Sequence, residues 1–100
     1  MKLYLISQEH VGGYDTYDSA VVSAKDEQDA KSIHPSDYTT HVTNGKWMGT
    51  YSGGDEIGKE YESGSYSGWV DYSDIGKIKV KLIGDSSVPR GLILASFNAG

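Results

Sequence analysis

The chain has 100 residues, a formal net charge of −5 and no cysteine. Chains of this length form one domain, so we predict a single domain over residues 1–100. The lack of cysteine excludes disulfides, thiolate metal sites and thiol nucleophiles. The negative charge argues against generic binding to nucleic-acid phosphates, so we expect no direct contact with nucleic acid.

The apolar runs are short throughout the chain. The run at residues 1–8 is shorter than the hydrophobic region of a signal peptide, and no run reaches the roughly 18 apolar residues of a membrane span. A small domain without cysteine fits a reducing compartment. We therefore expect a cytoplasmic protein that makes no membrane contact.

The first quarter of the chain predicts two strands joined by a turn. Residues 3–7 are an apolar run typical of a strand, and the glycine-containing stretch 9–15 predicts a turn. Residues 17–24 predict the second strand, in which alternate positions share a face. One face of this strand carries three small apolar residues: Ala20, Val22 and Ala24.

Residues 26–34 predict a helix. Asp26 is a favourable N-cap, and Pro35 prevents the helix from continuing. The apolar side is thin, with Ala30 and Ile33 spaced three residues apart. A helix this short persists only when it packs against other elements, so we expect it to lie on the sheet.

Residues 38–48 predict a β-hairpin. Asn44-Gly45 suits a two-residue type I′ turn, because both central residues of that turn need a positive φ. This register places Val42 opposite Trp47.

The segment 49–68 differs from the rest of the chain. It is polar, rich in glycine and nearly devoid of aliphatic residues, so we expect a long loop or a weak, exposed ribbon. Apolar character resumes at Trp69-Val70, and residues 73–76 predict a single turn.

Two strands are predicted near the C-terminus. In residues 77–83, strict alternation predicts that Ile78, Val80 and Leu82 face the core and that Lys77, Lys79 and Lys81 face away. Residues 92–97 predict a strand that is apolar on both faces, which favours a position in the centre of the sheet. These elements together predict an α+β fold, mainly an antiparallel sheet with one helix packed on one face.

The residue types that can carry catalysis or bind metals form no recognisable motif in this sequence. The spacings of His10, His34 and His41 match no zinc motif. Asp15 and Asp18 fall on opposite sides of a strand, so they do not form an acid–base pair. We therefore expect no catalytic residue, no metal ligand and no cofactor.

The segment 49–68 and the residues that follow it predict a partner-binding surface. Tyrosine and tryptophan interleaved with serine and glycine are typical of antibody paratopes, because these aromatic side chains give a large contact area at low entropic cost. Acidic residues outnumber lysines in this region, which favours a basic partner. The candidate contact residues are Tyr51, Asp55, Glu56, Tyr61, Glu62, Tyr66, Trp69 and Tyr72.

A second candidate surface would bind an anion. The lysine row Lys77, Lys79 and Lys81 is one part of it. The loop 84–91 supplies the other part, because Arg90 can grip a phosphate with two parallel hydrogen bonds.

Several stretches of the chain form a recognisable pattern. They are YDTYDSAVV at residues 14–22, IHP at 33–35, WV at 69–70, IG at 83–84 and SFNAG at 96–100. Together they resemble a family of small uncharacterised proteins of tailed bacteriophages and prophages. The resemblance covers both ends of the chain and leaves out about residues 36–68. It implies a phage context and no assigned activity.

The sequence thus leads to one main hypothesis and two alternatives. The main hypothesis is a phage-encoded binding protein, not an enzyme, that inhibits a host defence component by protein–protein contact, as anti-CRISPR proteins do. The partner would be a host protein, with a nucleic-acid-binding protein favoured by the acidic charge. One alternative is a homo-oligomer that sequesters a nucleotide signal. The other is a structural or accessory phage protein.

Overall fold

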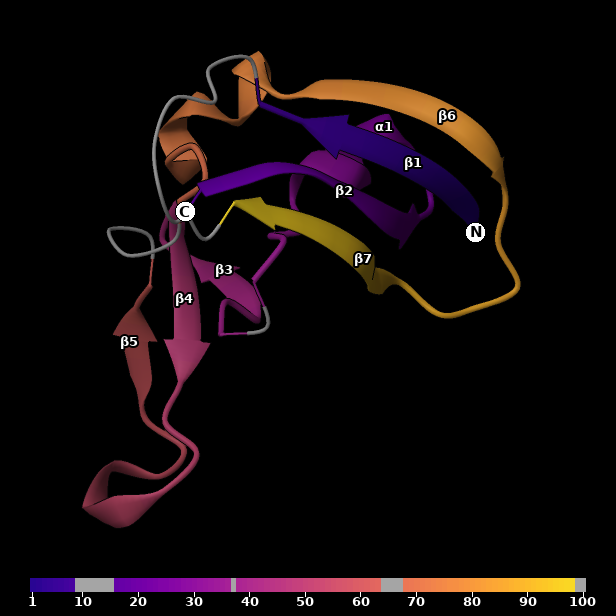
Figure 1. The fold of residues 1–100 in the computed structure, drawn as a ribbon. Helices are drawn as coiled ribbons and strands as arrows, with labels where there is room; N and C mark the ends of the chain where they lie inside the picture. The colour runs from indigo at the N-terminus through magenta and orange to yellow at the C-terminus, as the bar shows by residue number, and fades with distance from the viewer. Residues whose placement is uncertain (9–15, 37, 64–67, 99–100) are drawn as a thin grey trace.

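The computed structural model describes residues 1–8, 16–36, 38–63 and 68–98 (Figure 1). The turn predicted at residues 9–15 and the candidate contact residue Tyr66 lie outside these ranges.

The described strands form two antiparallel sheets rather than the one sheet that the sequence predicts (Figure 1). The first sheet has the order β6-β1-β2-β7, and the second has the order β3-β4-β5. The strands of the first sheet are β1 (Lys2–Ser7), β2 (Thr16–Ala24), β6 (Lys79–Asp85) and β7 (Gly91–Asn98). Those of the second are β3 (His41–Thr43), β4 (Lys46–Thr50) and β5 (Glu60–Glu62).

The helical content of the described chain is small. It comprises the α-helix α1 (Glu27–Lys31) and two 3₁₀ helices, Gly54–Glu56 and Tyr72–Lys77. The fold is therefore mainly antiparallel sheet with little helix. None of the helices in the described ranges has the length and apolar character needed to traverse a lipid bilayer.

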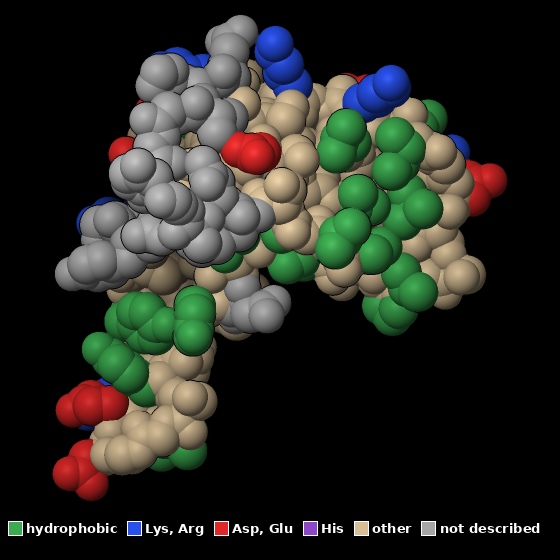
Figure 2. Space-filling view, in the orientation of Figure 1, with side chains coloured by type: hydrophobic (Ala, Val, Ile, Leu, Met, Phe, Trp, Pro, Cys, Tyr) green, Lys and Arg blue, Asp and Glu red, His purple; other side chains and the backbone are tan. Residues whose placement is uncertain are grey.

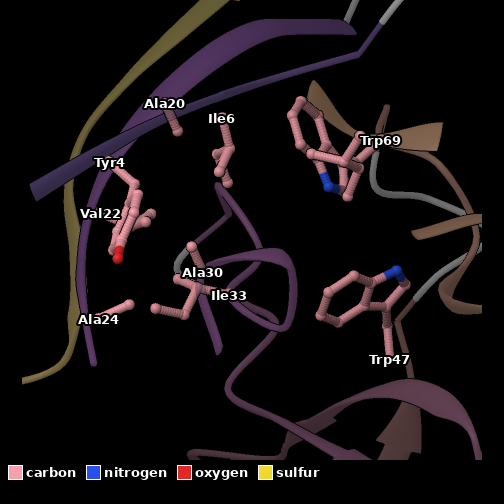
Figure 3. Close-up of a cluster of buried hydrophobic side chains, with 10 residues drawn as sticks. Tyr4, Ile6, Ala20, Val22, Ala24, Ala30, Ile33, Trp47 and Trp69 are labelled. Carbon is pink, nitrogen blue, oxygen red and sulfur yellow. The ribbon is translucent and has the colours of Figure 1, made fainter. Parts of the chain in front are cut away.

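The core lies between the first sheet and α1, and it extends to the base of the second sheet. Ala20, Val22 and Ala24 are all buried, which confirms the predicted inner face of β2. In Figure 3 these side chains lie on one side of Ala30 and Ile33 from the α1 region, and the two tryptophans lie on the other side. The buried apolar side chains are Tyr4, Ile6, Ala20, Val22, Ala24, Ala30, Ile33, Trp47, Trp69 and Ile78.

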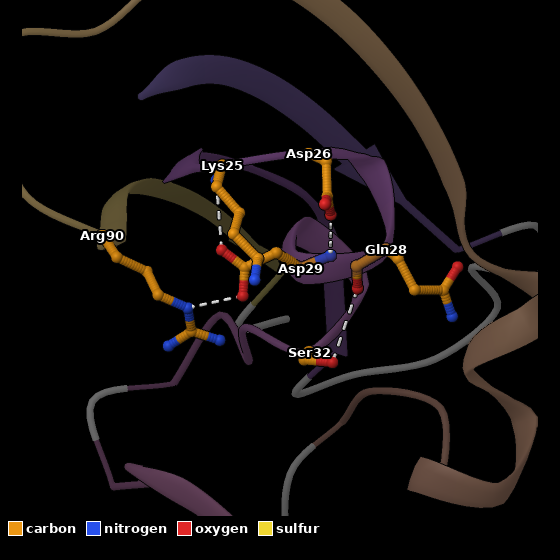
Figure 4. Close-up of polar contacts among 6 residues, drawn as sticks. All are labelled: Lys25, Asp26, Gln28, Asp29, Ser32 and Arg90. Carbon is orange, nitrogen blue, oxygen red and sulfur yellow. Dashed lines mark hydrogen bonds and ion pairs between the residues drawn. The ribbon is translucent and has the colours of Figure 1, made fainter.

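Helix α1 is shorter than predicted and is held by polar contacts at its N-terminal end (Figure 4). Asp26 caps it, because its Oδ1 accepts a hydrogen bond of 2.8 Å from the backbone N–H of Asp29. The Asp29 carboxylate in turn accepts from Arg90 Nε at 2.7 Å and from the backbone N–H of Lys25 at 3.1 Å. Burial raises the pKa of Asp29, but the hydrogen bonds and positive charges of Arg90 and Lys25 together lower it by more. The pKa of Asp29 is therefore below its ordinary value. The helix start and the beginning of β7 are thus joined.

The hairpin prediction is confirmed at its turn and in its register. Asn44 and Gly45 have φ values of 54° and 72°, as a type I′ turn requires. Val42 pairs with Trp47 across β3 and β4.

Two predictions about the first sheet are wrong. Among the described strands, β7 lies at an edge and not in the centre of the sheet, because β2 is its one neighbour in the sheet order. Leu82 is 51 % exposed although it pairs with the buried Tyr4. The physical reason is that β6 is the other edge, so a side chain there lacks a neighbouring strand on one side. Ile78 is buried and Val80 packs against the core, as predicted.

His34 lies at the junction of α1 and the second sheet. It is 4 % exposed, and its ring centroid lies 5.0 Å from that of Trp47 in an edge-to-face arrangement. The backbone N–H of Ser36 donates to Nδ1 at 2.9 Å, so Nδ1 carries no proton. Burial lowers the pKa of His34 to about 4. The ring is therefore neutral at physiological pH.

We expect the free energy of unfolding to fall as the pH drops from about 6.5 to about 4. In that window the unfolded chain binds a proton at His34 and the folded chain does not, because the folded pKa is the lower one. The loss is of the order of 3 kcal/mol. Urea unfolding across this pH range measures it.

The matched variants are His34→Asn and Ile33→Ala. Asparagine keeps an acceptor for Ser36 but does not titrate, so its pH dependence flattens between pH 4 and pH 6.5. Ile33→Ala creates a cavity beside the histidine and lowers stability, yet it retains the pH dependence. A His34→Asn protein with an unchanged slope would show that another group is responsible.

Candidate protein-binding arm

Residues 46–62 form a projection that we call the arm (Figure 1). It consists of β4, the 3₁₀ helix Gly54–Glu56 and β5. Strands β4 and β5 pair from Met48 opposite Glu62 to Thr50 opposite Glu60. Part of the segment predicted to be irregular is therefore a short, regular ribbon, which is the second form that the sequence analysis allowed.

Backbone hydrogen bonds close the tip of the arm. The N–H of Tyr51 donates to the carbonyl of Lys59 at 2.9 Å, and the N–H of Gly58 donates to the carbonyl of Tyr51 at 2.9 Å. Gly54 and Gly58 have φ values of 73° and 85°, a region that favours glycine. These bonds give the backbone of the tip a defined shape.

Gly49 allows the base of the arm to pack closely. It pairs with Tyr61, whose ring lies against it. A Cβ at position 49 would stand 2.3 Å from the carbonyl oxygen of Tyr38 and 2.7 Å from Cζ of Tyr61. The glycine therefore makes room for both the tyrosine ring and the segment that precedes β3.

Exposed tyrosines line a groove beside this glycine. Tyr38 is 78 % exposed and Tyr51 is 44 % exposed. The ring centroids of Tyr51 and Tyr61 lie 4.7 Å apart, and Tyr61 Oη donates to the carbonyl of Tyr38 at 3.5 Å. The space between them has a volume of about 410 Å³ and is completed by Thr40, Thr50 and Ser52. We call this feature the tyrosine groove.

Charged residues lie along the arm and at its tip (Figure 2). Glu56 pairs with Lys59 at 3.1 Å, and Glu62 pairs with Lys46 at 3.5 Å. All four side chains are more than half exposed. Exposed ion pairs contribute little to stability, so a partner's cations can replace these lysines at low cost.

Glu60 is held differently from the other acids of the arm. Its Oε1 lies 2.6 Å from His41 Nε2 and accepts from Thr43 Oγ1 at 3.3 Å. His41 Nδ1 lies 2.8 Å from Thr40 Oγ1. Because His41 and Thr43 belong to β3 and Glu60 belongs to β5, this chain of contacts spans β4 and braces the second sheet.

The structure separates the predicted contact residues into two groups. Tyr51, Tyr61, Asp55, Glu56 and Glu62 all lie on the arm. The other group consists of Trp69 and Tyr72.

The placement of this second group is a correction. Trp69 is 6 % exposed and belongs to the core, and Tyr72 is half-buried with its ring 5.3 Å from that of Trp47. Trp69 therefore supplies no open contact area, whereas Tyr72 keeps part of its surface in a depression that Lys46 and Glu62 also line. The interleaving of aromatic residues with serine and glycine did not reveal this burial, because Trp69 and Tyr72 directly follow the tyrosine-rich segment in the sequence.

Two contributors to the surface are not among the residues predicted from the sequence. Tyr38 is the most exposed of the large apolar and aromatic side chains that are described, and Ile57 at the tip is 65 % exposed. A signal for Tyr38 was available, since an aromatic residue just before a short hairpin strand has few neighbours to bury it.

The predicted anion-binding residues do not converge. Lys77 pairs with Asp74 at 3.5 Å, and Arg90 pairs with Asp29 at 2.7 Å. Lys79 and Lys81 lie on β6, whereas Arg90 directly precedes β7. Strands β1 and β2 separate these two edges, a distance of about 14 Å at the usual strand spacing. One phosphate therefore cannot reach both.

Among the residues that the structure describes, no three His, Asp or Glu side chains gather as metal ligands would. A cleft of about 320 Å³ lies between the end of α1, β3 and the start of β7, and Arg90 and His41 are among its lining residues. Both are already engaged with carboxylates.

Comparison with known proteins adds no relative. No protein-family model, curated protein or solved structure matches the chain.

We expect Gly49→Ala to destabilise the arm. The added Cβ would meet a backbone carbonyl and a ring held in place by its strand, so the free energy of unfolding falls by about 2 kcal/mol. Gly53→Ala is the matched control, since a Cβ there meets nothing within 4 Å and φ is −156°. Urea unfolding of both variants measures the difference. Equal stability of the two would contradict the packing described for Gly49.

Proposed function

We propose that this protein works by binding another protein through the tyrosine groove and the tip of the arm. The observation that carries the proposal is the pair of exposed tyrosines, Tyr38 and Tyr51, on either side of a groove of about 410 Å³. Tyrosine is enriched where protein interfaces gain most of their binding energy.

The charge of the arm supports a basic partner. Between residues 46 and 62 the chain has four carboxylates against two lysines. Among the described contacts, Asp55 has no ion pair, and the pairs of Glu56 and Glu62 are exposed. A cationic surface on the partner would gain contacts with these groups, and complementary charge also speeds association.

The resemblance of the sequence pattern to small phage proteins favours a host component as the partner. Proteins that handle nucleic acid present cationic surfaces, which an acidic arm can occupy in place of the phosphate backbone. The protein would then act as an inhibitor of host defence, in the manner of anti-CRISPR proteins. Occupation of such a surface needs no catalysis and no cofactor.

Capture from a lysate of a phage-susceptible bacterium tests the proposal. We expect the wild-type protein to retain a basic host protein and the double variant Tyr38→Ala, Tyr51→Ala to lose it. Purified components should then show at least a tenfold loss of affinity by calorimetry, since interface tyrosines often contribute more than 1 kcal/mol each. Leu82→Ala is the control, because Leu82 is 51 % exposed on β6, away from the arm.

A second measurement separates specific binding from adhesion. The captured protein should release its nucleic acid when wild-type protein is added, and the double variant should not displace it. Equal capture by wild type and double variant, or capture without displacement, would refute the proposed inhibition.

A further inference from the structure

The two edges of the first sheet differ in charge. Strand β6 has the sequence KVKLIGD, with Lys79, Lys81 and Asp85, whereas β7 has the sequence GLILASFN and contains no charged residue and no proline. The pairing of β6 with β1 has one register irregularity and that of β7 with β2 has two, one of them next to Leu94, so irregularity does not single out β6 as the protected edge, whereas charge does. Charged side chains, lysine above all, protect a sheet edge from pairing with another chain. By this criterion β6 is protected and β7 is not.

Strand β7 is open along one side within the described chain. It pairs with β2 alone, and the backbone hydrogen bonds that join separate described segments include none from β7. Two of its apolar side chains are exposed as well: Leu94 is 67 % exposed and Ile93 is 46 % exposed. An edge strand of eight residues with these properties is a template for another strand.

The face of the sheet opposite α1, which we call the open face, bears an apolar row that ends at this edge. The strand registers place Leu5 opposite Val21 and Val21 opposite Leu94. On the other side Leu5 pairs with Lys81, so the row runs from a lysine at β6 to a leucine at β7. These three apolar residues also line a shallow depression of about 260 Å³. Figure 2 shows apolar side chains gathered over this face.

The loop between β6 and β7 covers one end of the open face. The Ser23 hydroxyl is fully buried there, with Ser86 Oγ at 2.8 Å and the carbonyl of Val88 at 3.0 Å. The apolar row lies beyond that cover. The β6–β7 loop thus covers one part of the open face. No described segment covers the part that ends at β7.

We propose that β7 pairs antiparallel with β7 of a second copy of this chain, around a two-fold axis at Leu94. The two sheets then form one continuous sheet of eight strands. An antiparallel pair of identical strands is self-complementary, as a two-fold interface requires. Because β7 is uncharged, the strands meet without repulsion between like charges.

The proposed axis also completes the apolar row. Leu94 would lie opposite Leu94 of the second copy, so the row would continue from Leu5 and Val21 through both leucines to the equivalent residues beyond. The lysine-bearing β6 strands would form the two outer edges of the dimer. Since those edges are protected, assembly would stop at two copies instead of growing into a filament.

A cysteine at the axis tests this arrangement directly. Residues opposite each other in an antiparallel pair have Cα atoms about 4.5–5.5 Å apart, within the range for disulfides. The chain has no cysteine of its own, so Leu94→Cys introduces a single thiol. We expect it to form a disulfide-linked dimer under mild oxidation. Leu82→Cys, at 51 % exposure on the opposite edge, is the control and should remain a free thiol.

Light scattering after size-exclusion chromatography supplies the second test. The wild-type protein should have twice the mass of one chain. Leu94→Lys should raise the dissociation constant of the dimer at least tenfold and keep the circular dichroism of the folded protein, whereas Leu82→Lys should remain dimeric. Because the disulfide test does not depend on the lysine variant, a folding defect in Leu94→Lys leaves the proposal testable.

Each other outcome would overturn the proposal. A monomeric wild-type protein would mean that the edge accepts no second copy. A dimer that neither Leu94→Cys links nor Leu94→Lys dissociates would place the interface elsewhere. A larger assembly would show that β6 does not stop growth. None of these results bears on the arm, so the proposed function is tested independently.

Discussion

The packing of Trp47 joins the two sheets of this protein. Trp47 belongs to β4 but is 2 % exposed, because its ring lies in the core of the other sheet and of α1. Its Nε1 donates to the carbonyl of Val70 at 2.9 Å, and its ring packs edge-to-face against His34 and Tyr72. The second sheet contributes one large side chain to the shared core, and this side chain orients the arm that projects from it.

This anchoring explains why the arm can be both polar and ordered. A short ribbon of two strands is marginally stable by itself in water. Here Trp47 fixes one end, and Ser63 extends the contact, because its N–H donates to the carbonyl of Trp47 at 3.0 Å. Ser63 Oγ also lies 2.7 Å from Thr39 Oγ1, and both residues are buried. The base of the arm is therefore stabilised by the core, so the tip is free to carry exposed tyrosines and carboxylates.

Local sequence signals predicted much of the fold. The capping by Asp26, the turn at Asn44-Gly45 and the alternation in β2 each depend on a few neighbouring residues, and each is found in the structure. The order of the strands in a sheet depends on contacts between distant segments, which no local pattern encodes. An apolar strand such as β7 is therefore equally compatible with a central position and with an edge that another chain covers.

The same distinction explains what could be predicted of the candidate site. Composition located Tyr51 and Tyr61 correctly, because the pairing of β4 with β5 brings together residues that are close in sequence. It did not separate them from Trp69, whose burial depends on packing against His34 and in the core beside the first sheet. Nor did it include Tyr38, which reaches the groove only because Gly49 lets the segment before β3 approach β4.

The apolar character of β7 has a different physical meaning from that of the tyrosine groove. Tyrosine keeps a polar hydroxyl, so an exposed tyrosine remains soluble without a permanent partner. Leu94 and Ile93 have no polar group, and their exposure on an unprotected edge costs free energy for as long as water covers them. The tyrosine groove therefore suits a partner that binds transiently. The β7 edge suits a permanent partner, which must be present wherever the chain itself is present. A second copy meets that condition, and it would place two arms on one assembly and raise the avidity for a partner that presents two sites.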